Sequence, residues 1–278
     1  MMLNQRIQKF YDESTPLWLD IWGEHMHHGY YENGKLSNKT HTEAQVDLVA
    51  ELLRWGNIHA SNHILDVGCG VGGSARLLAK KYDAQVLGLT LSPVQAKNAQ
   101  RYNQETGLDK QIHIEVKDMM SMIDADQKFD LIWSLESAEH IVDKKGLLEM
   151  FYKLLNPKGR LIMATWCHRN VPPVLEFSEK KLLHKIYDLY HLAPMVSIEF
   201  VDNTIKDAGF TEVLSEDWSE SVAPFWKAVI QSIFQWRSLK GLLHAGWPTI
   251  KGAWAMQYMT KGYKKGLIKF GVFQGMKI

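Results

Sequence analysis

Cysteine is scarce in this sequence of 278 residues, and the two that occur, Cys69 and Cys167, form no CxxC pair. This excludes the clustered spacing of a zinc or iron–sulfur site and gives no reason to expect disulfides. Long apolar runs are absent too, since none approaches the roughly 18 uninterrupted residues of a membrane span. Residues 1–10 are polar where a secretory signal would be apolar. We therefore expect a cytoplasmic protein.

The sequence also lacks an excess of either charge. Lys and Arg number 32 against 31 Asp and Glu, which gives a formal net charge of +1. Without a basic excess, nucleic acid is not an expected partner. The length suits one large core with an added cap.

Short apolar segments alternate with helical patterns through the middle of the chain. Such alternation predicts parallel strands with right-handed crossovers, in a doubly wound sheet. A further helix and two further strands extend this Rossmann-like α/β pattern toward the C-terminus. The expected strands are 64–67, 85–89, 112–116, 129–134, 160–164, 211–214 and 267–273, and the expected helices after the first 60 residues include 92–106, 146–155, 198–208 and 221–235.

Three regions follow from this pattern. Residues 1–60 read as a helical N-terminal lid, interrupted by a loop at 25–31, where the helical period breaks. Residues 61–166 form the predicted cofactor-binding core. Residues 167–278 combine helical insertions that bind substrate with the last strands of the sheet.

A glycine-rich turn, DVGCGVGG at 66–73, follows the first predicted strand and opens a helix. It satisfies both a GxGxG and a GxGxxG template, so the glycines alone do not name the ligand. Charge separates the alternatives, because the Asp66 carboxylate would repel a pyrophosphate but suits a ligand with an ammonium and a sulfonium. S-adenosylmethionine has both groups, and it is the cofactor that we predict.

The ends of the next strands refine this choice. Thr90 ends the second strand, where a dinucleotide would favour an acidic residue, and Asp118 follows the third strand, where it suits an adenine amino group. An NAD-dependent oxidoreductase remains the alternative from another class. Tyr30, with Trp22, is expected to cover the methionine end of the ligand. The candidate cofactor contacts are Asp66, Gly68, Cys69, Gly70, Gly72, Thr90, Leu91, Gln95, Asp118, Met119, Ser134, Tyr30 and Trp22.

The segment 134–140, SLESAEH, follows the fourth strand, at the sheet edge where ligands bind in open α/β folds. His140 titrates near neutral pH and is the candidate base for the acceptor proton, with Glu136 or Glu139 orienting its ring. A metal at His25, His27 and His28 is not expected, because no further ligands are evident and alkyl transfer from a sulfonium needs none.

Tryptophan is abundant, at ten residues. These rings either fill the core or line an acceptor pocket, and the candidate substrate contacts are His28, Trp166, Trp226 and Trp247. The lysines Lys261, Lys264, Lys265 and Lys269 either form a solvated face or make weak contact with an anionic membrane surface. The expected oligomeric state is monomer or homodimer.

Taken together, several segments resemble the γ-tocopherol methyltransferase family of the class I methyltransferases. The resemblance spans nearly the whole chain, and IWGEHMHHGYY at 21–31 is more specific than the widely shared glycine turn. The other matching segments are YDES at 11–14, ILDVGCG at 64–70, LTLSP at 89–93, WSLES at 133–137, EH at 139–140, TWCHR at 165–169 and GYKKG at 262–266.

The resemblance implies a seven-stranded core with a helical lid and cap, and transfer of a methyl group to a ring carbon of a small hydrophobic aromatic acceptor such as a prenylated chromanol. Relatives that methylate nitrogen in indole alkaloids provide an alternative. Ala138, Ile141 and Val142 depart from the family pattern, and so does the segment 171–194, which also leaves a non-catalytic cofactor-binding protein open. The plastid extension of plant members is absent, which predicts a cyanobacterial type of chain.

Overall fold

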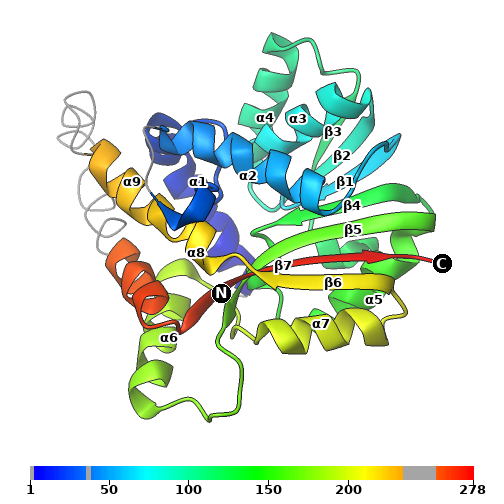
Figure 1. The fold of residues 1–278 in the computed structure, drawn as a ribbon. Coiled ribbons are helices and arrows are strands. Elements are labelled where there is room, and N and C mark those ends of the chain that lie inside the picture. The colour runs from blue at the N-terminus through cyan, green and yellow to red at the C-terminus, as the bar shows by residue number, and fades with distance from the viewer. Residues whose placement is uncertain (1–2, 36–38, 234–254) are drawn as a thin grey trace.

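A seven-stranded mixed sheet runs through the computed structural model, which describes residues 3–35, 39–233 and 255–278. Its order is β3-β2-β1-β4-β5-β7-β6 (Figure 1). Strands β1 to β5 pair in parallel, whereas β7 runs antiparallel to both of its neighbours. The predicted fold class is confirmed. The strands are β1 (His63–Val67), β2 (Gln85–Thr90), β3 (Ile112–Val116), β4 (Phe129–Leu135), β5 (Leu155–His168), β6 (Thr211–Asp217) and β7 (Ile268–Met276).

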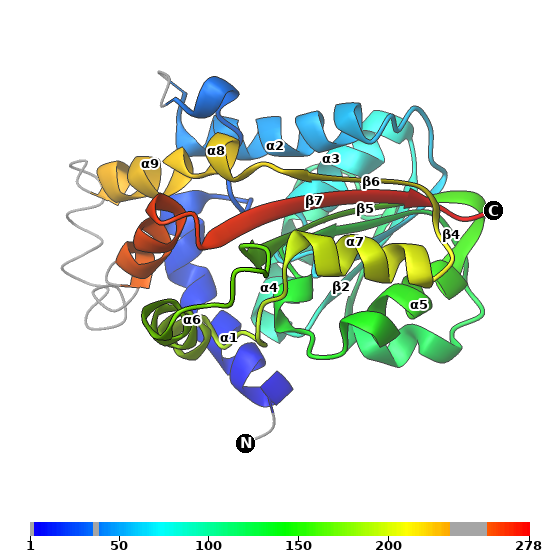
Figure 2. The same ribbon diagram turned by 60° about the horizontal axis from the view of Figure 1, so that its bottom comes forward.

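Helices cover both faces of the sheet, and each face has its own apolar cluster. The helices α2 (His41–Trp55), α3 (Gly73–Tyr82) and α4 (Pro93–Glu105) contribute to one cluster. The helices α5 (Lys144–Leu154) and α7 (Ile198–Asp207) contribute to the other. Figure 2 shows α2 and α3 on the side of the sheet opposite α5 and α7.

A third apolar cluster lies at one end of the sheet (Figure 1). It joins α1 (Leu3–Trp22), α6 (Phe177–Tyr190), α9 (Pro224–Ile233) and the helical residues 255–264. These elements come from both ends of the sequence, so the N-terminal helix packs with the predicted cap. The short elements are η1 (Glu32–Gly34), η2 (Met119–Asp124), η3 (Ala138–His140) and α8 (Ser219–Val222).

Two elements depart most from their predicted bounds. Strand β5 begins at Leu155 rather than at 160, because the expected turn joins the sheet: Lys158, at φ +64°, donates its N–H to Lys277, which in turn donates to Gly159. The helix expected at 221–235 is divided into α8 and α9, since Pro224 begins the second helix. Within the described residues, no helix combines the length and apolarity that crossing a bilayer requires.

The side chain of Gln45, on α2, holds the loop between α1 and α2 in place. This fully buried side chain donates from Nε2 to the carbonyl oxygens of His25, at 2.6 Å, and of His27, at 2.8 Å. The loop also approaches α2 closely, since a Cβ on Gly29 would lie 2.6 Å from the Cβ of Ala44. Its backbone is therefore fixed where it passes the carboxyl ends of the strands.

Replacing Gln45 by Leu is expected to lower the free energy of unfolding by about 1–3 kcal/mol, because two buried carbonyls lose their donor. Urea unfolding measures the change. Gln104→Leu, at an exposed position of α4, is the matched control. Equal stability of the two variants would show that the loop does not depend on this side chain.

Candidate active site

A cavity of about 940 Å³, including its open mouth, lies at the carboxyl ends of the parallel strands. Its lining comes from β1, β2 and β4, from α1 and from the 25–31 loop. Most of the predicted cofactor contacts line it: Asp66, Gly68, Cys69, Gly70, Thr90, Leu91, Gln95, Asp118 and Met119.

The glycine turn at the base of this cavity needs its missing side chains. Gly68 has φ +76°, and a Cβ there would lie 2.3 Å from the Cβ of Ser137. Gly70 has φ +55°, and a Cβ there would meet nothing within 4 Å. The left-handed backbone favours glycine at both positions, and the space at Gly70 lets a ligand approach the main chain.

Asp66, next to the last residue of β1, is a buried carboxyl that is only 2% exposed, and its Oδ2 has no hydrogen-bond partner. Burial raises the pKa of Asp66 to about 7, although the backbone of Ala75 and the Arg76 guanidinium act in the opposite direction. A cationic ligand would supply the missing partner. The cavity therefore fits a ligand with an ammonium or sulfonium, as the sequence predicts.

Two other predicted contacts already have partners. The Thr90 hydroxyl donates to Oε1 of Gln95 at 2.8 Å, so it shapes the turn after β2 rather than facing a ribose freely. Asp118 accepts from Asn4 of α1 at 2.6 Å and from the backbone of Met120 at 2.9 Å. The N-terminal helix thus reaches the position predicted for the adenine.

Four predicted cofactor contacts do not line this cavity. Gly72 is the N-cap of α3, and Ser134 is buried with its hydroxyl 2.9 Å from that of Ser137. Tyr30 packs against Trp218 with ring centroids 5.4 Å apart, because the loop turns its side chain toward α8. Trp22 lies in a second cavity instead. The expectation that Tyr30 and Trp22 cover the methionine end is therefore corrected.

The second cavity, of about 510 Å³, adjoins the first. The two share Tyr11, Met26, Glu136 and His140 in their linings. Aromatic rings from α1, β5, α6 and α9 make up most of the remaining wall. They are Phe10, Trp18, Trp22, Trp166, Tyr190 and Trp226.

This aromatic cavity also has polar groups without partners. The buried atoms Trp22 Nε1, Trp226 Nε1, Tyr190 Oη and Glu139 Oε2 all lack a hydrogen-bond partner. Buried polar atoms are normally paired, so these four mark a place for a ligand with its own polar groups. An aromatic molecule with a hydroxyl or amino group fits this lining.

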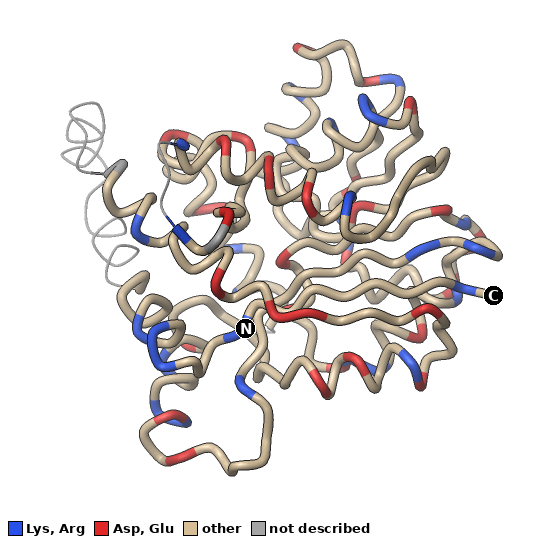
Figure 3. Tube along the Cα trace, in the orientation of Figure 1, with Lys and Arg blue, Asp and Glu red and all other residues tan. Residues whose placement is uncertain are grey.

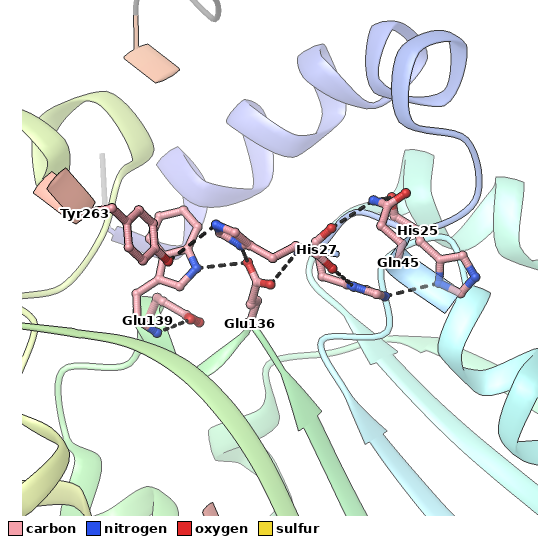
Figure 4. A network of polar contacts seen from close by, with 8 residues as sticks. His25, His27, Gln45, Glu136, Glu139 and Tyr263 are labelled. Carbon is pink, nitrogen blue, oxygen red and sulfur yellow. Dashed lines mark hydrogen bonds and ion pairs between the residues drawn. The ribbon is translucent and has the colours of Figure 1, made fainter. Parts of the chain in front are cut away.

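Glu136 connects the loop, the sheet and the cap (Figure 4). Its carboxylate accepts from the backbone and Nδ1 of His28, at 2.6 and 2.8 Å, and from Nε1 of Trp166 at 2.9 Å. Burial acts to raise the pKa of Glu136, but the contacts with His28 act in the opposite direction. The pKa is lowered overall, so Glu136 stays ionised. These three hydrogen bonds tie Glu136 into the structure of the wall.

His28 is buried behind this carboxylate and lines neither cavity. Its predicted contact with substrate is therefore corrected to support of Glu136. Trp166 and Trp226 do line the aromatic cavity, and Trp247 lies outside the described residues. The three loop histidines form no metal cluster with one another, and the described parts of the chain contain no group of three suitable ligands.

His140 is oriented by groups that the sequence analysis did not identify. Its Nδ1 donates to the carbonyl of His191 at 3.2 Å, which leaves Nε2 to accept from the Tyr11 hydroxyl at 2.8 Å. Burial lowers the pKa of His140 to about 4, so the ring is neutral. Neither Glu136 nor Glu139 forms a hydrogen bond with the ring, which corrects their predicted orienting role. The YDES segment contained Tyr11, but its sequence gave no sign of this partner.

Tyr11→Phe is expected to lower the free energy of unfolding by about 0.5–1.5 kcal/mol, because Nε2 of His140 loses its only protein donor among the contacts of the described chain. The ring contacts of Tyr11 with Phe10 and Trp18 would remain. Thermal unfolding measures the loss against Tyr102→Phe on α4. A variant as stable as this control would contradict the assigned bond.

Glu139 faces the aromatic cavity with one free oxygen. Its Oε1 accepts from the backbone N–H of Trp166 at 2.8 Å, whereas Oε2 is buried without a partner. Burial, with a contribution from the Glu136 charge, raises the pKa of Glu139 to about 7. A carboxyl that titrates near neutral pH is suited to take a proton from a bound acceptor.

Comparison with known proteins identifies the family. Residues 3–228 match the family described as mycolic acid cyclopropane synthetase. A probable tocopherol O-methyltransferase from Oryza sativa subsp. japonica chloroplasts is 42% identical over 97% of this chain and 77% of its own length. Norajmaline N-methyltransferase from Rauvolfia serpentina is 30% identical over 96% of this chain and 95% of its own.

The fold has solved counterparts as well. The cyclopropane synthase MmaA2 from Mycobacterium tuberculosis superposes with a TM-score of 0.86 at 20% identity, covering 99% of this chain and 98% of that one. The two sequence relatives are named as methyltransferases, which excludes the oxidoreductase alternative, and solved structures of the same fold hold S-adenosylmethionine or its demethylated product, which confirms the predicted cofactor. The chain belongs to the tocopherol methyltransferase family of class I enzymes, and S-adenosylmethionine is its methyl donor.

Proposed function

We propose that this enzyme methylates a ring carbon of a hydrophobic phenol, of the chromanol or hydroquinone class. One observation carries the proposal: an aromatic cavity adjoins the cofactor cavity and contains a buried carboxyl, Glu139, with an unpaired oxygen. The relative that is 42% identical is named for tocopherol, which is itself a phenol with an apolar body.

The residues of the first cavity suit S-adenosylmethionine bound in one orientation. Asp66 would hold the charged methionine end, the Gly70 backbone would lie against the nucleoside, and Asp118 would accept from the adenine amino group. When bound, S-adenosylmethionine supplies a methyl group on a positively charged sulfur. The residues shared by the two cavities, Tyr11 and His140 among them, would then border both reactants.

Glu139 would act on the acceptor. Its Oε2 takes the proton of the phenol hydroxyl, which raises the electron density at the neighbouring ring carbon. That carbon forms the new bond to the methyl group as the bond between the methyl group and sulfur breaks, which leaves neutral S-adenosylhomocysteine. The ring carbon then loses its own proton, the one proton that the reaction releases, and Glu139 returns the hydroxyl proton to the ring oxygen, which restores the aromatic phenol. His140 is less suited to this step than the sequence suggests, because its pKa is about 4 and Tyr11 occupies its free nitrogen.

The aromatic walls would align the acceptor and exclude water. Trp18 and Trp22 stack with centroids 5.3 Å apart, and Trp166 and Tyr190 meet edge to face at 5.6 Å. Rigid rings of this kind hold a flat molecule at low entropic cost. Holding the reacting atoms at about 3–3.5 Å provides much of the acceleration in such reactions.

Methylation of a nitrogen is the second candidate, because the Rauvolfia serpentina relative is named as an N-methyltransferase. Incubating the enzyme with trideuteromethyl S-adenosylmethionine and a panel of chromanols, hydroquinones and indoline amines tests both. Mass spectrometry with fragmentation identifies the labelled atom. We expect ring-carbon labelling of the phenols. A label on the phenol oxygen would overturn transfer to a ring carbon, and labelling of the amines alone would overturn the proposal in favour of the second candidate.

A further inference from the structure

The segment that leads from β5 into α6 presents large apolar side chains to solvent. Val171 is 42% exposed, Val174 is 73% exposed and Phe177 is 84% exposed. Pro172 and Pro173 lie between the two valines and are also exposed. The segment projects away from the sheet below α6 (Figure 1). Grouped exposure of this kind marks an interaction surface rather than ordinary surface composition.

The projecting segment is tied down at its base by Arg169. The guanidinium donates to the carbonyls of Asn170, Pro173 and Val174, at 3.0, 2.6 and 3.2 Å, and pairs with Glu179 at 2.7 Å. The backbone of Arg169 donates to Leu267 at 2.9 Å. The apolar tip is therefore held in shape by contacts behind it.

Basic residues flank this tip. Residues 255–269 contain four lysines and no acidic residue, and one of the four, Lys269, pairs with Asp217. Helix α6 adds the exposed Lys180, Lys181 and Lys185. The acidic residues of this part of the chain are the N-cap Glu176, Glu179, which pairs with Arg169, and Asp188. Lys265 influences the pKa of Glu179, which places the two basic segments close together.

The formal net charge of the whole chain is only +1, so these basic residues at one end show that charge is distributed unevenly over the molecule. Figure 3 shows Lys and Arg gathered along α6 and the helical residues 255–264. An exposed apolar tip with a basic rim is the pattern of a protein that inserts shallowly into an anionic lipid surface.

We propose that this end of the molecule docks on an anionic phospholipid bilayer, with Val174 and Phe177 entering the interface and the lysines meeting the headgroups. This goes beyond methyl transfer. Leu175, between the two, packs in the apolar cluster that contains Trp22 and Trp226 of the aromatic cavity. The docked face thus continues into the wall of the acceptor site.

Vesicle flotation without any acceptor tests the docking separately from catalysis. We expect the protein to float with vesicles that contain phosphatidylglycerol and to remain largely free with phosphatidylcholine alone. Replacing both Val174 and Phe177 by Ser should lower partitioning by about tenfold or more. Each Lys→Ala change at Lys181, Lys264 or Lys265 should lower it by about fivefold, and high salt should act similarly.

Matched controls lie on other faces: Phe200→Ser on α7 and Lys97→Ala on α4, both at exposed positions. Neither should change partitioning. Equal flotation of the double Ser variant and the wild type would overturn the proposal. So would equal binding to neutral vesicles. A loss of self-association in light scattering, without an effect on vesicles, would assign the surface to a second copy of the chain instead.

A local probe gives an independent result. Both native cysteines are buried, so Ser178→Cys can be labelled selectively with an environment-sensitive dye. We expect a blue shift and stronger emission when phosphatidylglycerol vesicles are added. The same dye at Lys110→Cys, near β3, should not respond. An unchanged signal at position 178 would contradict the docking.

Discussion

Asp66→Asn is expected to weaken S-adenosylmethionine binding by about 30-fold or more. Truncating one partner of a buried charge pair costs about 2–5 kcal/mol, and the amide keeps the shape of the carboxyl without its charge. Folding should be preserved, because burial already favours the neutral form of this side chain: the pKa of Asp66 lies near 7 rather than 3.8. Calorimetric titration measures the affinity.

The pH dependence gives this prediction a second readout. Asp66 is largely protonated below its pKa of about 7, and a cationic ligand favours the ionised form. Wild-type affinity should therefore rise between pH 6 and pH 8, with proton release on binding at pH 6. The Asn variant should show neither effect.

Asp126→Asn, at an exposed loop position, is the control for the substitution. It should bind the cofactor like the wild type at both pH values. If Asp66→Asn bound as tightly as this control, the unpaired oxygen of Asp66 would not be the cation site.

Glu139→Gln is expected to lower turnover of a phenolic acceptor by about 100-fold or more, the range for loss of a positioned proton acceptor. Cofactor affinity should not change, because Glu139 lines only the aromatic cavity. A drop in kcat without a change in cofactor binding distinguishes this residue from Asp66. Rapid-quench measurement of one turnover isolates the chemical step.

The pH profile separates the two carboxyls, whose pKa values are both near 7. At saturating S-adenosylmethionine the cation keeps Asp66 ionised, so a remaining rise in kcat from pH 6 to pH 8 reports Glu139. That rise should vanish in the Gln variant. Glu149→Gln, exposed on α5, should retain it. Full turnover by Glu139→Gln would return the role of base to His140 or favour a nitrogen acceptor.

Local sequence patterns predict much of the fold because they reflect the burial of apolar side chains and the backbone conformation of individual residues. The apolar runs at β1, β2 and β4 are buried in the sheet, and the glycine turn lies where positive φ is required. Asp66 could be placed from its position beside that turn. The antiparallel β7 could not, since its pairing depends on how the distant cap returns the chain.

The finer geometry of the site depends on contacts between distant segments. Tyr11 meets His140 across 129 positions, and His28 meets Glu136 across 108. Nothing in a local motif reveals that both oxygens of Glu136 accept hydrogen bonds whereas one oxygen of Glu139 has no partner. For the same reason, the sequence does not reveal that Tyr30 packs against Trp218 or that Trp22, at the end of α1, lines the aromatic cavity.

The most direct test of the account is a crystal structure with S-adenosylhomocysteine and a chromanol bound together. We predict that the nucleoside lies against the turn at Gly70, with the amino group of its homocysteine end near Asp66. The phenol oxygen should lie within hydrogen-bond distance of Oε2 of Glu139. The sulfur should face the aromatic cavity, beside Tyr11 and His140, which line both cavities. A chromanol bound outside the aromatic cavity, or with its hydroxyl directed away from Glu139, would contradict the account.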